Sequence, residues 1–390
     1  MSTRTVRLGI AGAGFMGLRT YVDAIRGAKH VLSENGVKVV LGSHYVRDRA
    51  KHAEVKDRGG AEVVTDNLTE AIDASDIFYN CLPNEAHEAP TIQAIEAGKH
   101  VGCEKPLGRD LGAAERICAA AAKAQNIRTL CMYCYTGADA VQLGRRNVEQ
   151  GLILGSNSWL QGNGDFLQDW GISNRSNWRF DQQIAGPGGI LDDLLQHTLS
   201  VLFGWLGAGK QLVAVKADLA YANGDGERLT FVDGTDGSAR SRAVDAATAT
   251  LKFECGSTFS LQTSRMARGQ KARCKVALYG YHGAQEWDLH DGHRLSYCAK
   301  SSTDGLVKTA AEFQGWNSIH CSSGEHGNWA SVPGLTRGYD SYFANLIAAH
   351  VLSVVQDTPT PTMKACGTVF SPFIPDFNFA LKMQKITAAM

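Results

Sequence analysis

The chain has 390 residues, of which 44% are hydrophobic and 20% are charged, and its 39 basic side chains balance its 39 acidic ones. This length and composition predict a globular protein of two or three domains and exclude a disordered chain, a collagen and a coiled coil. A formal net charge of zero gives no electrostatic reason to expect nucleic acid or an anionic membrane as a partner.

The pattern of apolar residues and cysteines indicates where the protein works. No stretch reaches the roughly 18 apolar residues of a membrane span, and the N-terminus lacks the apolar core of a signal peptide. The cysteines are scattered, and the Cys131–Cys134 pair stands alone in an apolar run. We interpret them as buried thiols rather than a metal or redox site. We therefore expect a cytoplasmic protein in a reducing compartment, with no metal.

Short apolar runs alternate with helical patterns over residues 1–130. Strands are expected at Val6–Ala11, Val37–Leu41, Ile77–Leu82, His100–Cys103 and Thr129–Tyr133. Helices are expected between them, at Gly17–Arg26, Leu68–Ala74, Ala86–Ala97 and Leu111–Ala124. This alternation predicts an α/β domain with a doubly wound parallel sheet of the Rossmann type, in which ligands bind beyond the carboxyl ends of the strands.

Residues 131–390 show a different pattern, in which strand-like runs follow one another with short glycine-containing connections. The runs lie at Ser158–Phe166, Leu212–Ala220, Ala246–Phe253, Thr258–Thr263, Ala272–Tyr279, Ala284–Leu289 and Arg294–Cys298. We expect an α+β domain with a large, mainly antiparallel open sheet. Helices covering one face are expected at Gly189–Leu206, Tyr339–Val355 and Asp376–Ala389, and long loops at Asn223–Ala243 and Ser301–Gly338. Since an open sheet has a second face to bury, we expect a homodimer or homotetramer.

A glycine-rich turn, Gly12-Ala13-Gly14-Phe15-Met16-Gly17, follows the first expected strand and opens a helical pattern. In that position Gly12 can make the tight turn, Gly14 can let the backbone approach a pyrophosphate, and Gly17 can let helix and strand pack closely. A coincidental turn is the alternative. The position favours a dinucleotide site, with Phe15 and Met16 also at the cofactor.

The end of the second strand is expected to distinguish NAD from NADP. An acidic residue that binds the adenosine ribose is expected near position 43 or 44, but Ser43 and His44 stand there, followed by Arg47 and Arg49. A hydroxyl and a guanidinium suit a ribose 2′-phosphate, so this segment favours NADP over NAD. The alternative is a pair of solvated arginines at the start of a surface helix.

Two further segments carry chemistry. The first is Gly98-Lys99-His100-Val101-Gly102-Cys103-Glu104-Lys105-Pro106-Leu107, and the second combines Trp178-Arg179-Phe180 with a glycine-rich helix entry, Gly186–Gly189, that leads to Asp193 and His197. Two other dehydrogenase classes do not fit: no tyrosine is followed four residues later by lysine, as one short-chain signature requires, and the cysteine cluster of zinc-dependent alcohol dehydrogenases is not present.

At these residues the chain resembles the Gfo/Idh/MocA family of nicotinamide-dependent sugar and polyol dehydrogenases. The resemblance covers the glycine turn, Asn84–His87, the segment Ala97–Pro106, the Trp178-Arg179 pair, Asp193 with His197, and Ser264-Arg265. Leu167-Gln168-Asp169-Trp170, Trp178-Arg179-Phe180 and Ile184–Gly186 resemble the levoglucosan dehydrogenase and glycoside 3-dehydrogenase branch.

Oxidation of a secondary alcohol needs a base for the hydroxyl proton and a cation or donor at the oxygen, requirements that His197 and Lys105 meet. The resemblance implies that Lys105 anchors the reacting hydroxyl, that His197 accepts its proton, and that Asp193 is the partner of His197. It further implies cofactor contacts by Asn84, His87, Glu104, Lys105, Trp178 and Arg179, and substrate contacts by Lys105, Tyr135, Gln168, Asp193 and His197.

Each of these roles has a structural alternative. Lys105 could be an exposed turn lysine, and His197 a histidine bonded to a carbonyl at the edge of the core. Asp192 competes with Asp193, although the four-residue spacing to His197 favours Asp193. Cys134-Tyr135-Thr136 stands where many members have Asn-Tyr-Arg, which leaves the identity of the substrate open.

The function expected from these residues is transfer of a hydride between a ring secondary hydroxyl of a sugar, glycoside or anhydrosugar, at C3, and NADP or NAD. Two alternatives remain. One is a redox-neutral, NAD-dependent glycosidase that oxidises C3 transiently, and the other is a non-enzymatic sensor of sugars or dinucleotides. A sensor would have no need of Lys105 or of the Asp193–His197 pair.

Overall fold

The computed structural model describes residues 3–124, 126–154, 159–172, 177–207, 211–222, 229–231, 243–299, 315–321, 338–365 and 368–390. The chain divides into two compact units, one of residues 1–137 and 327–384 and the other of residues 138–326 and 385–390. This division differs from the predicted boundary near residue 130, because the chain returns to the first unit after residue 326. Most residues of the two predicted long loops lie outside the described part of the chain.

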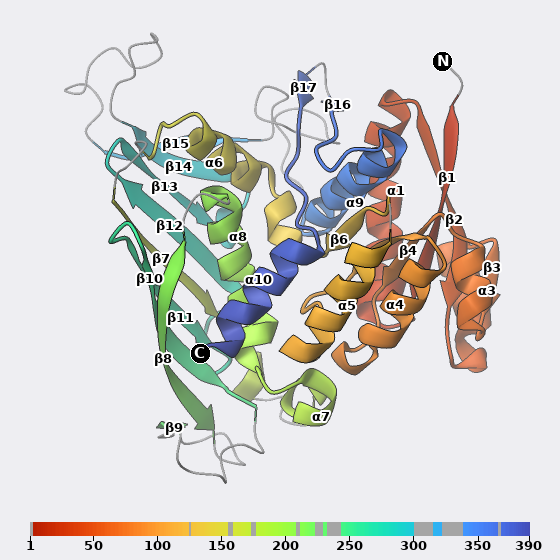
Figure 1. The fold of residues 1–390 in the computed structure, drawn as a ribbon, viewed down its shortest axis with the longest axis horizontal. Helices are drawn as coiled ribbons and strands as arrows, with labels where there is room; N and C mark the ends of the chain where they lie inside the picture. The colour runs from red at the N-terminus through yellow and green to blue at the C-terminus, as the bar shows by residue number, and fades with distance from the viewer. Residues whose placement is uncertain are drawn as a thin grey trace. The chain divides into compact units, whose positions relative to one another are not determined.

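The first unit contains a six-stranded, wholly parallel sheet with the strand order β3-β2-β1-β4-β5-β6 (Figure 1). Its strands are β1 (Arg4–Ala11), β2 (Val37–Tyr45), β3 (Val63–Thr65), β4 (Ile77–Asn80), β5 (His100–Cys103) and β6 (Thr129–Cys131). Leu8, Ile77, Phe78, Val101 and Leu130 are completely buried, as expected for a parallel sheet covered on both faces. The predicted doubly wound sheet is confirmed, and its order reverses between β1 and β4, the place where such sheets bind dinucleotides.

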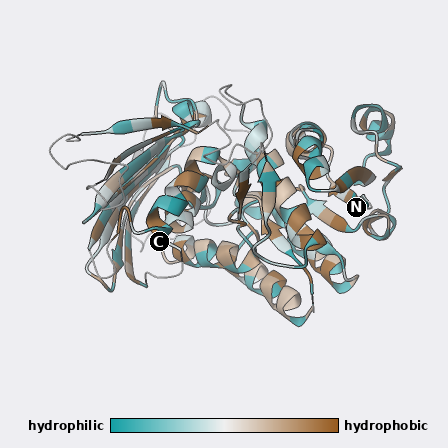
Figure 2. Ribbon diagram, turned by 90° about the horizontal axis from the view of Figure 1, so that it is seen from above, coloured by the Kyte–Doolittle hydropathy of each residue, from teal (hydrophilic) through white to brown (hydrophobic). Residues whose placement is uncertain are grey.

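Helices cover this sheet. They are η1 (Phe15–Tyr21), α1 (Val22–Glu34), η2 (Arg49–Lys51), α2 (His52–Gly59), α3 (Leu68–Asp73), η3 (Asn84–Ala86), α4 (Glu88–Glu96), α5 (Leu111–Lys123), η4 (Cys134–Gly137) and α9 (Asp340–Val355). Side chains set some of the helix starts, since Asn67 accepts the N–H groups of Thr69 and Glu70, and Asp110 accepts that of Ala113. Hydrophilic and hydrophobic residues are interspersed along the helices in Figure 2, as expected for helices that place one face on a sheet.

Helix α9 corrects one prediction, because it does not serve as a cover of the second sheet. It packs against α1 in the first unit, as Figure 1 shows, and its His350 lies 3.2 Å from the hydroxyl of Tyr79 in β4. The rings of Tyr21 and Phe343 are 5.8 Å apart, between η1 and α9. All residues of α9 from Ser341 to Val354 are buried, so it is a core helix. A helix that is buried on every side has no single apolar stripe that would indicate the surface it packs on.

The hairpin of β16 (Met363–Ala365) and β17 (Thr368–Phe370) follows α9, and the last helix is α10 (Phe377–Ala388). Residues of α10 up to Gln384 belong to the first unit, where the Gln384 side chain bonds both backbone groups of Gly108. No helix in the described part of the chain is long and apolar enough to cross a membrane.

The second unit is built on a nine-stranded sheet with the order β15-β14-β13-β12-β7-β11-β10-β8-β9. Its strands are β7 (Leu160–Leu167), β8 (Leu212–Ala222), β9 (Leu229–Phe231), β10 (Ala246–Phe253), β11 (Thr258–Ser264), β12 (Arg273–Gly280), β13 (Gly283–Asp288), β14 (Arg294–Ala299) and β15 (Asn317–His320). The pairing of β7 with β11 is parallel and the other pairings are antiparallel, which confirms a mainly antiparallel sheet. β9 and β15 fall in segments predicted as loops, where that prediction is wrong.

Helices α6 (Asp139–Glu149) and α8 (Gln196–Leu206) pack on one face of this sheet (Figure 1). The indole of Trp205 in α8 donates to the Val141 carbonyl in α6 at 2.9 Å. Glycine makes the close approach to the sheet possible, because a Cβ at Gly164 of β7 would overlap the methyl group of Thr198 in α8. Short helical segments connect these elements: η5 (Trp170–Ile172), η6 (Trp178–Phe180), α7 (Gln182–Ala185), η7 (Leu191–Leu195) and η9 (Leu289–Asp291).

Candidate functional site

The glycine turn after β1 has the geometry of a pyrophosphate cradle. Gly12 has φ +110° and its N–H donates to the Tyr45 carbonyl at 3.0 Å. A Cβ at Gly17 would overlap the Gly12 carbonyl, whereas a Cβ at Gly14 would meet nothing within 4 Å. The turn is therefore closed on the protein side and open above Gly14, so the residues present fit a dinucleotide.

The helix that follows this turn begins as a π-helix, η1, whose N-cap Gly14 has no side chain to cap it. The Phe15 side chain is 68% exposed beside the turn, and Met16 is half-buried. Uncapped N–H groups at a helix start favour an anion, which is the usual place of a dinucleotide pyrophosphate.

Ser43 and His44 are completely buried and bonded to the backbone. The Ser43 hydroxyl donates to the Ala71 carbonyl at 2.6 Å, and His44 Nε2 lies 2.7 Å from the Gly12 carbonyl oxygen. Burial lowers the pKa of His44, so its neutral ring supports the glycine turn from below. The Ser43 hydroxyl is therefore buried and bonded within the domain, so it no longer favours a ribose 2′-phosphate.

Tyr45 occupies the strand end where the ribose-binding acid of this fold usually stands. It pairs with Ala11, the last residue of β1. The register between β1 and β2 shifts after Leu8, since Leu8 pairs with Leu41 and Gly9 with Ser43. This bulge extends β2 beyond the predicted end at Leu41 and places its last residue at Tyr45.

The two arginines beyond β2 differ in their surroundings. The Arg49 guanidinium binds the Asp66 carboxylate through Nε at 2.7 Å and Nη2 at 3.1 Å, which lowers the pKa of that carboxyl. Arg47 is exposed to solvent. Of this pair, Arg47 is the guanidinium that remains available to a ligand.

His87 supports the turn that carries Lys105. It is buried, with Nδ1 2.7 Å from the Pro106 carbonyl oxygen and Nε2 2.8 Å from that of Leu82. Burial lowers the pKa of His87 although these two carbonyls act in the opposite direction. Both ring nitrogens are engaged by the backbone, so His87 connects the loops after β4 and β5 rather than facing the cofactor as the resemblance implies. Asn84 is buried in η3 between these loops.

Glu104 and Lys105 follow β5 at the carboxyl edge of the sheet, the edge that also carries the glycine turn. The Glu104 N–H donates to the Asn80 carbonyl at 2.9 Å, and its carboxylate accepts the Lys105 N–H at 3.3 Å. Burial, together with the Glu104 carboxylate, raises the pKa of the Tyr21 hydroxyl. Glu104 is buried and Lys105 is half-buried, so of the two it is the lysine that a ligand can reach.

Buried thiols surround this turn. Burial raises the pKa of Cys81, Cys103 and Cys131, and raises that of Cys134 to about 12. A thiol that stays protonated is a poor nucleophile and a poor metal ligand, so these cysteines pack as small apolar groups.

Tyr135 lies in η4 and is buried against the rings of Tyr339 and Tyr342, whose centroids are 6.2 Å and 6.5 Å away. It belongs to the first unit, with Lys105.

The other predicted substrate contacts belong to the second unit. His197 lies in the first turn of α8, buried, with its ring 5.7 Å from that of Phe166. Gln168 follows β7, where its N–H donates to the Ser264 carbonyl at 2.9 Å and its carbonyl accepts the Ala267 N–H at 3.0 Å. These two bonds fix the backbone of Gln168 beside the end of β11.

The structure separates the roles of Asp192 and Asp193, which share the π-helix η7. Asp192 Oδ1 accepts from Gln196 Nε2 and from Thr387 Oγ1, both at 2.7 Å, and the residue is 5% exposed. Asp193 Oδ2 lies 3.2 Å from Arg265 Nη2, and its Oδ1 lies 3.4 Å from Arg179 Nε. Asp192 joins α8 to the C-terminal residues, whereas Asp193 pairs with two guanidinium groups. Its partnership with His197 stays a prediction.

Aromatic rings complete this cluster. The Arg179 guanidinium carbon lies 4.5 Å from the ring centroid of Trp178, and that of Arg265 lies 4.9 Å from the Phe180 centroid. Trp170 packs edge-on against Phe180, with centroids 5.6 Å apart. Residues 168–172 and 177–180, η7 and the end of β11 thus meet in one charged and aromatic cluster within the second unit.

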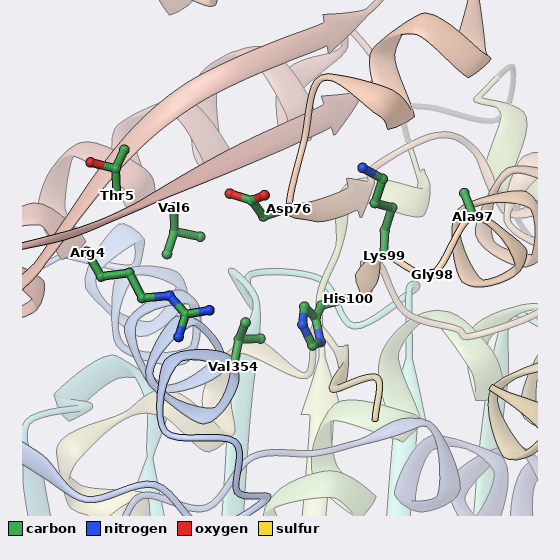
Figure 3. A pocket seen from close by; sticks show the side chains of 9 residues that line it. All are labelled: Arg4, Thr5, Val6, Asp76, Ala97, Gly98, Lys99, His100 and Val354. Atoms are coloured by element: carbon green, nitrogen blue, oxygen red, sulfur yellow. The ribbon is translucent and has the colours of Figure 1, made fainter. Parts of the chain in front are cut away.

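A pocket of about 340 Å³ lies elsewhere, at the amino ends of β1, β4 and β5 (Figure 3). It is lined by Arg4, Asp76, Lys99 and His100 among others. Arg4 donates to the carbonyl of Val355 and Lys99 to that of Asp73, the last residues of α9 and α3. These cations serve as helix C-caps, and the pocket lies at the sheet edge opposite to the one that binds ligands in this fold.

Comparison with known proteins agrees with this geometry. Residues 6–131 match the model of an oxidoreductase family with an NAD-binding Rossmann fold, and residues 159–286 match the C-terminal domain of the same Gfo/Idh/MocA family. The chain belongs to the Gfo/Idh/MocA family.

Relatives within the Gfo/Idh/MocA family include dehydrogenases of sugars and polyols. Levoglucosan dehydrogenase of Pseudarthrobacter phenanthrenivorans is 28% identical over 310 residues, which are 76% of this chain and 76% of that protein. An inositol 2-dehydrogenase of Cereibacter sphaeroides is 37% identical over 113 residues, which are 29% of this chain and 32% of that protein.

Solved structures share the Gfo/Idh/MocA fold over nearly the whole chain. A levoglucosan dehydrogenase in complex with NADH and levoglucosan has a TM-score of 0.81 at 22% identity, covering 99% of this chain and 96% of that one. An inositol dehydrogenase homologue from Azotobacter vinelandii, complexed with NAD+, has a TM-score of 0.73 at 17% identity, covering 100% and 95%.

Arg265 has a position that the sequence pattern does not predict. Ser264-Arg265 is part of the family resemblance, which implies no role for the arginine. The available signal was a charged residue directly after the alternating strand Thr258–Ser264, where a solvent-facing position is the usual expectation. The structure instead places Arg265 at 0% exposure.

Proposed function

We propose that this protein is an NAD-dependent dehydrogenase that oxidises a ring secondary hydroxyl, at C3, of an uncharged pyranoside or anhydrosugar. The observation that carries the proposal is the position of Lys105. A half-buried ammonium group at the carboxyl edge of the sheet, on the same edge as the open cradle over Gly14, suits an alcohol held beside a nicotinamide. Levoglucosan dehydrogenase, which matches 76% of the chain, supports the substrate class.

Each of the candidate residues has a distinct role in the proposed reaction. Lys105 donates a hydrogen bond to the reacting oxygen and stabilises the negative charge that develops there, while His197 accepts the hydroxyl proton. Asp193 accepts a hydrogen bond from a substrate hydroxyl. NAD, when bound over Gly12–Gly17, supplies the hydride acceptor.

The choice of NAD rests on the end of β2. Of the residues that favoured NADP in the sequence, Ser43 donates to the Ala71 carbonyl and Arg49 binds Asp66. Neither of these groups is therefore available to bind a ribose 2′-phosphate, and of the segment that favoured NADP only the Arg47 guanidinium remains as a candidate. Relatives with NADH or NAD+ in their structures support the same choice.

A sugar screen tests the proposal. The purified protein is mixed with NAD or NADP and a panel that includes levoglucosan, glucosides and inositols, and nicotinamide absorbance is followed. We expect turnover of at least one neutral sugar with NAD. Absence of turnover in the whole panel with bound cofactor contradicts a dehydrogenase, and release of an aglycone without net NADH indicates the redox-neutral glycosidase.

The Lys105→Met variant tests the assigned lysine. We expect kcat/KM for the sugar to fall by roughly 10³-fold, because oxyanion-type stabilisation contributes about that factor, while NAD still binds. Lys99→Met is the matched control, since Lys99 caps α3 at the opposite edge of the same sheet and should leave activity unchanged. Equal activity of Lys105→Met and wild type would rule out this role for Lys105.

A further inference from the structure

Arg265 is a fully buried positive charge in the second unit. Its side chain has no exposed surface, and it follows β11 directly. Burial lowers its pKa, while the neighbouring carboxylates of Asp193 and Asp245 act in the opposite direction. A buried guanidinium is costly unless it is paired, so its partners are expected to be held firmly.

Contacts on several sides fix the orientation of this guanidinium. Nη2 lies 3.2 Å from Asp193 Oδ2, and Nη1 donates to the Arg179 carbonyl at 3.3 Å. The planar group lies 4.9 Å from the Phe180 ring centroid and 5.7 Å from that of Trp170. A Cβ on Gly171 would lie 2.7 Å from the Arg265 Cβ, so glycine is required behind it. The fork therefore presents one geometry to Asp193.

The Asp193 carboxylate is held at both oxygens. Oδ2 faces Arg265 and Oδ1 faces Arg179, whose own guanidinium lies over the Trp178 ring. An ionised carboxylate has about four acceptor positions, and the two guanidinium groups approach it from different oxygens.

The exposed fractions of the three side chains indicate that the Asp193 carboxylate can contact a ligand as well as the two arginines. In the Arg265–Asp193 pair the guanidinium is 0% exposed and the carboxylate is 15% exposed. Arg179, on the other oxygen, is 33% exposed. Accessibility rises from the buried arginine through the carboxylate to the second arginine, so the carboxylate is the anchored group that a ligand can meet.

We propose that Arg265 is a positioning residue that fixes the Asp193 carboxylate as a hydrogen-bond acceptor for a substrate hydroxyl. The buried fork sets the position of the carboxylate, and Arg179 completes the clamp through its side chain and its carbonyl. This role rests on the proposed sugar oxidation, because it assigns to Asp193 a hydroxyl of that substrate. It selects for neutral polyhydroxy compounds that donate a hydrogen bond at this position.

The test compares Arg265→Met, Arg265→Lys and Asp193→Asn, singly, and the double variant Asp193→Asn/Arg265→Met. For the sugar identified in the screen we expect kcat/KM to fall on the order of 10- to 100-fold in Arg265→Met, the loss typical of a misplaced binding group. The loss is expected mainly in KM for the sugar. NAD affinity should stay within about twofold, and Arg265→Lys, which keeps the charge, should recover part of the loss.

Two comparisons distinguish positioning from simple bracing. The double variant is expected to be no less active than Asp193→Asn alone, because Arg265 acts through Asp193. Arg273→Met is the matched control: it removes another Arg–Asp pair of the same sheet, 3.3 Å from Asp165, and should leave KM unchanged. Losses that multiply in the double variant, or a KM effect equal to that of the control, would overturn the proposal.

Thermal unfolding provides a second test of the Arg265–Asp193 interaction, and this test does not depend on catalytic activity. Arg265→Met and Asp193→Asn should each lower Tm, because each strands a buried partner, and the double variant should regain part of the loss. If the wild type oxidises no sugar but this coupling is present, the proposed function fails while the anchoring of Asp193 stands. Additive Tm losses would contradict the anchoring, whatever the activity.

Discussion

Polar residues of this protein divide by what their atoms are bonded to. Ser43, His44 and His87 are buried and bonded to backbone oxygens, whereas Lys105 and Asp193 retain exposed surface. A buried polar group must find a partner, and the backbone is the nearest supply. The first three therefore stabilise the loops that hold the candidate site, and the last two remain able to meet a ligand.

At the residue scale, Arg47 decides how far NADP is tolerated. We expect the wild type to bind NAD more tightly than NADP, and Arg47→Ala to weaken NADP by up to about tenfold while NAD changes little, since a charge-assisted bond contributes about 1.5 kcal/mol or more. Binding is measured by titration of both cofactors.

Arg49→Ala is the control for this prediction, because its guanidinium binds Asp66. Tighter binding of NADP than of NAD by the wild type would contradict the proposed cofactor. An unchanged NADP to NAD ratio in Arg47→Ala would show that Arg47 does not meet a 2′-phosphate.

At the scale of elements, the sheet edges are defined by contacts that sequence periodicity does not contain. The bulge between Leu8 and Gly9 moves the end of β2 to Tyr45, and α9 packs on α1 although it follows the second sheet in the chain. In both cases the local pattern predicted the type of element correctly. Its length or its partner depended on residues far away in sequence.

The docking of α9 makes stability depend on pH. His350 Nε2 lies 3.2 Å from the Arg128 carbonyl oxygen, and its Nδ1 lies 3.2 Å from the Tyr79 hydroxyl. Burial lowers the pKa of His350 from 6.5 to about 3, so the folded protein keeps it neutral. The unfolded chain takes up this proton below about pH 6.5, and the contribution to stability is therefore complete above that pH and is lost as pH falls towards 3.

We expect the free energy of unfolding to decrease by about 1.4 kcal/mol per pH unit below pH 6.5 on account of His350. In His350→Gln the pH dependence of unfolding between about pH 5.5 and 4 should be shallower by this amount, as measured by denaturant titration. His30→Gln, at an exposed position of α1, is the control. Parallel pH profiles of His350→Gln and wild type would contradict the assignment.

At the scale of the whole molecule, the second sheet changes the argument for oligomerisation. Polar side chains lie on the face opposite the buried one, and those of Gln161, Asn163, Thr248, Ser260 and Gln262 are all exposed to solvent. An antiparallel sheet can leave a polar face in water. The polar face therefore does not need to be buried, and the open sheet alone is a weak reason to expect an oligomer.

Exposed aromatic residues at one end of this sheet supply a better reason for self-association. Trp159, Tyr281 and Trp316 are 52%, 60% and 50% exposed. The pairing of Leu160 with Gly280 places Trp159 beside Tyr281, and the ring of Trp316 lies 6.3 Å from that of Tyr279. An exposed aromatic group of this kind favours a protein contact.

We therefore expect a homodimer or homotetramer in solution, measured by size-exclusion chromatography with light scattering. Tyr281→Lys should shift the mass to a smaller species without lowering Tm, because it places a positive charge among the exposed aromatic residues that we expect to form the contact. Val369→Lys, at an exposed apolar position in β17 of the first unit, is the control. A wild-type monomer at tens of micromolar would contradict the expectation.

Local pattern alone determined the class of both sheets, most helices and the cradle at Gly12–Gly17, because periodicity and glycine placement act over neighbouring residues. Only the tertiary structure decided that Asp192 is structural, that Asp193 is clamped by Arg179 and Arg265, and that Ser43 and His87 face the backbone. Each of these outcomes depends on partners far away in sequence or on burial. Residue type and spacing do not encode which buried partner a polar side chain meets when the chain closes.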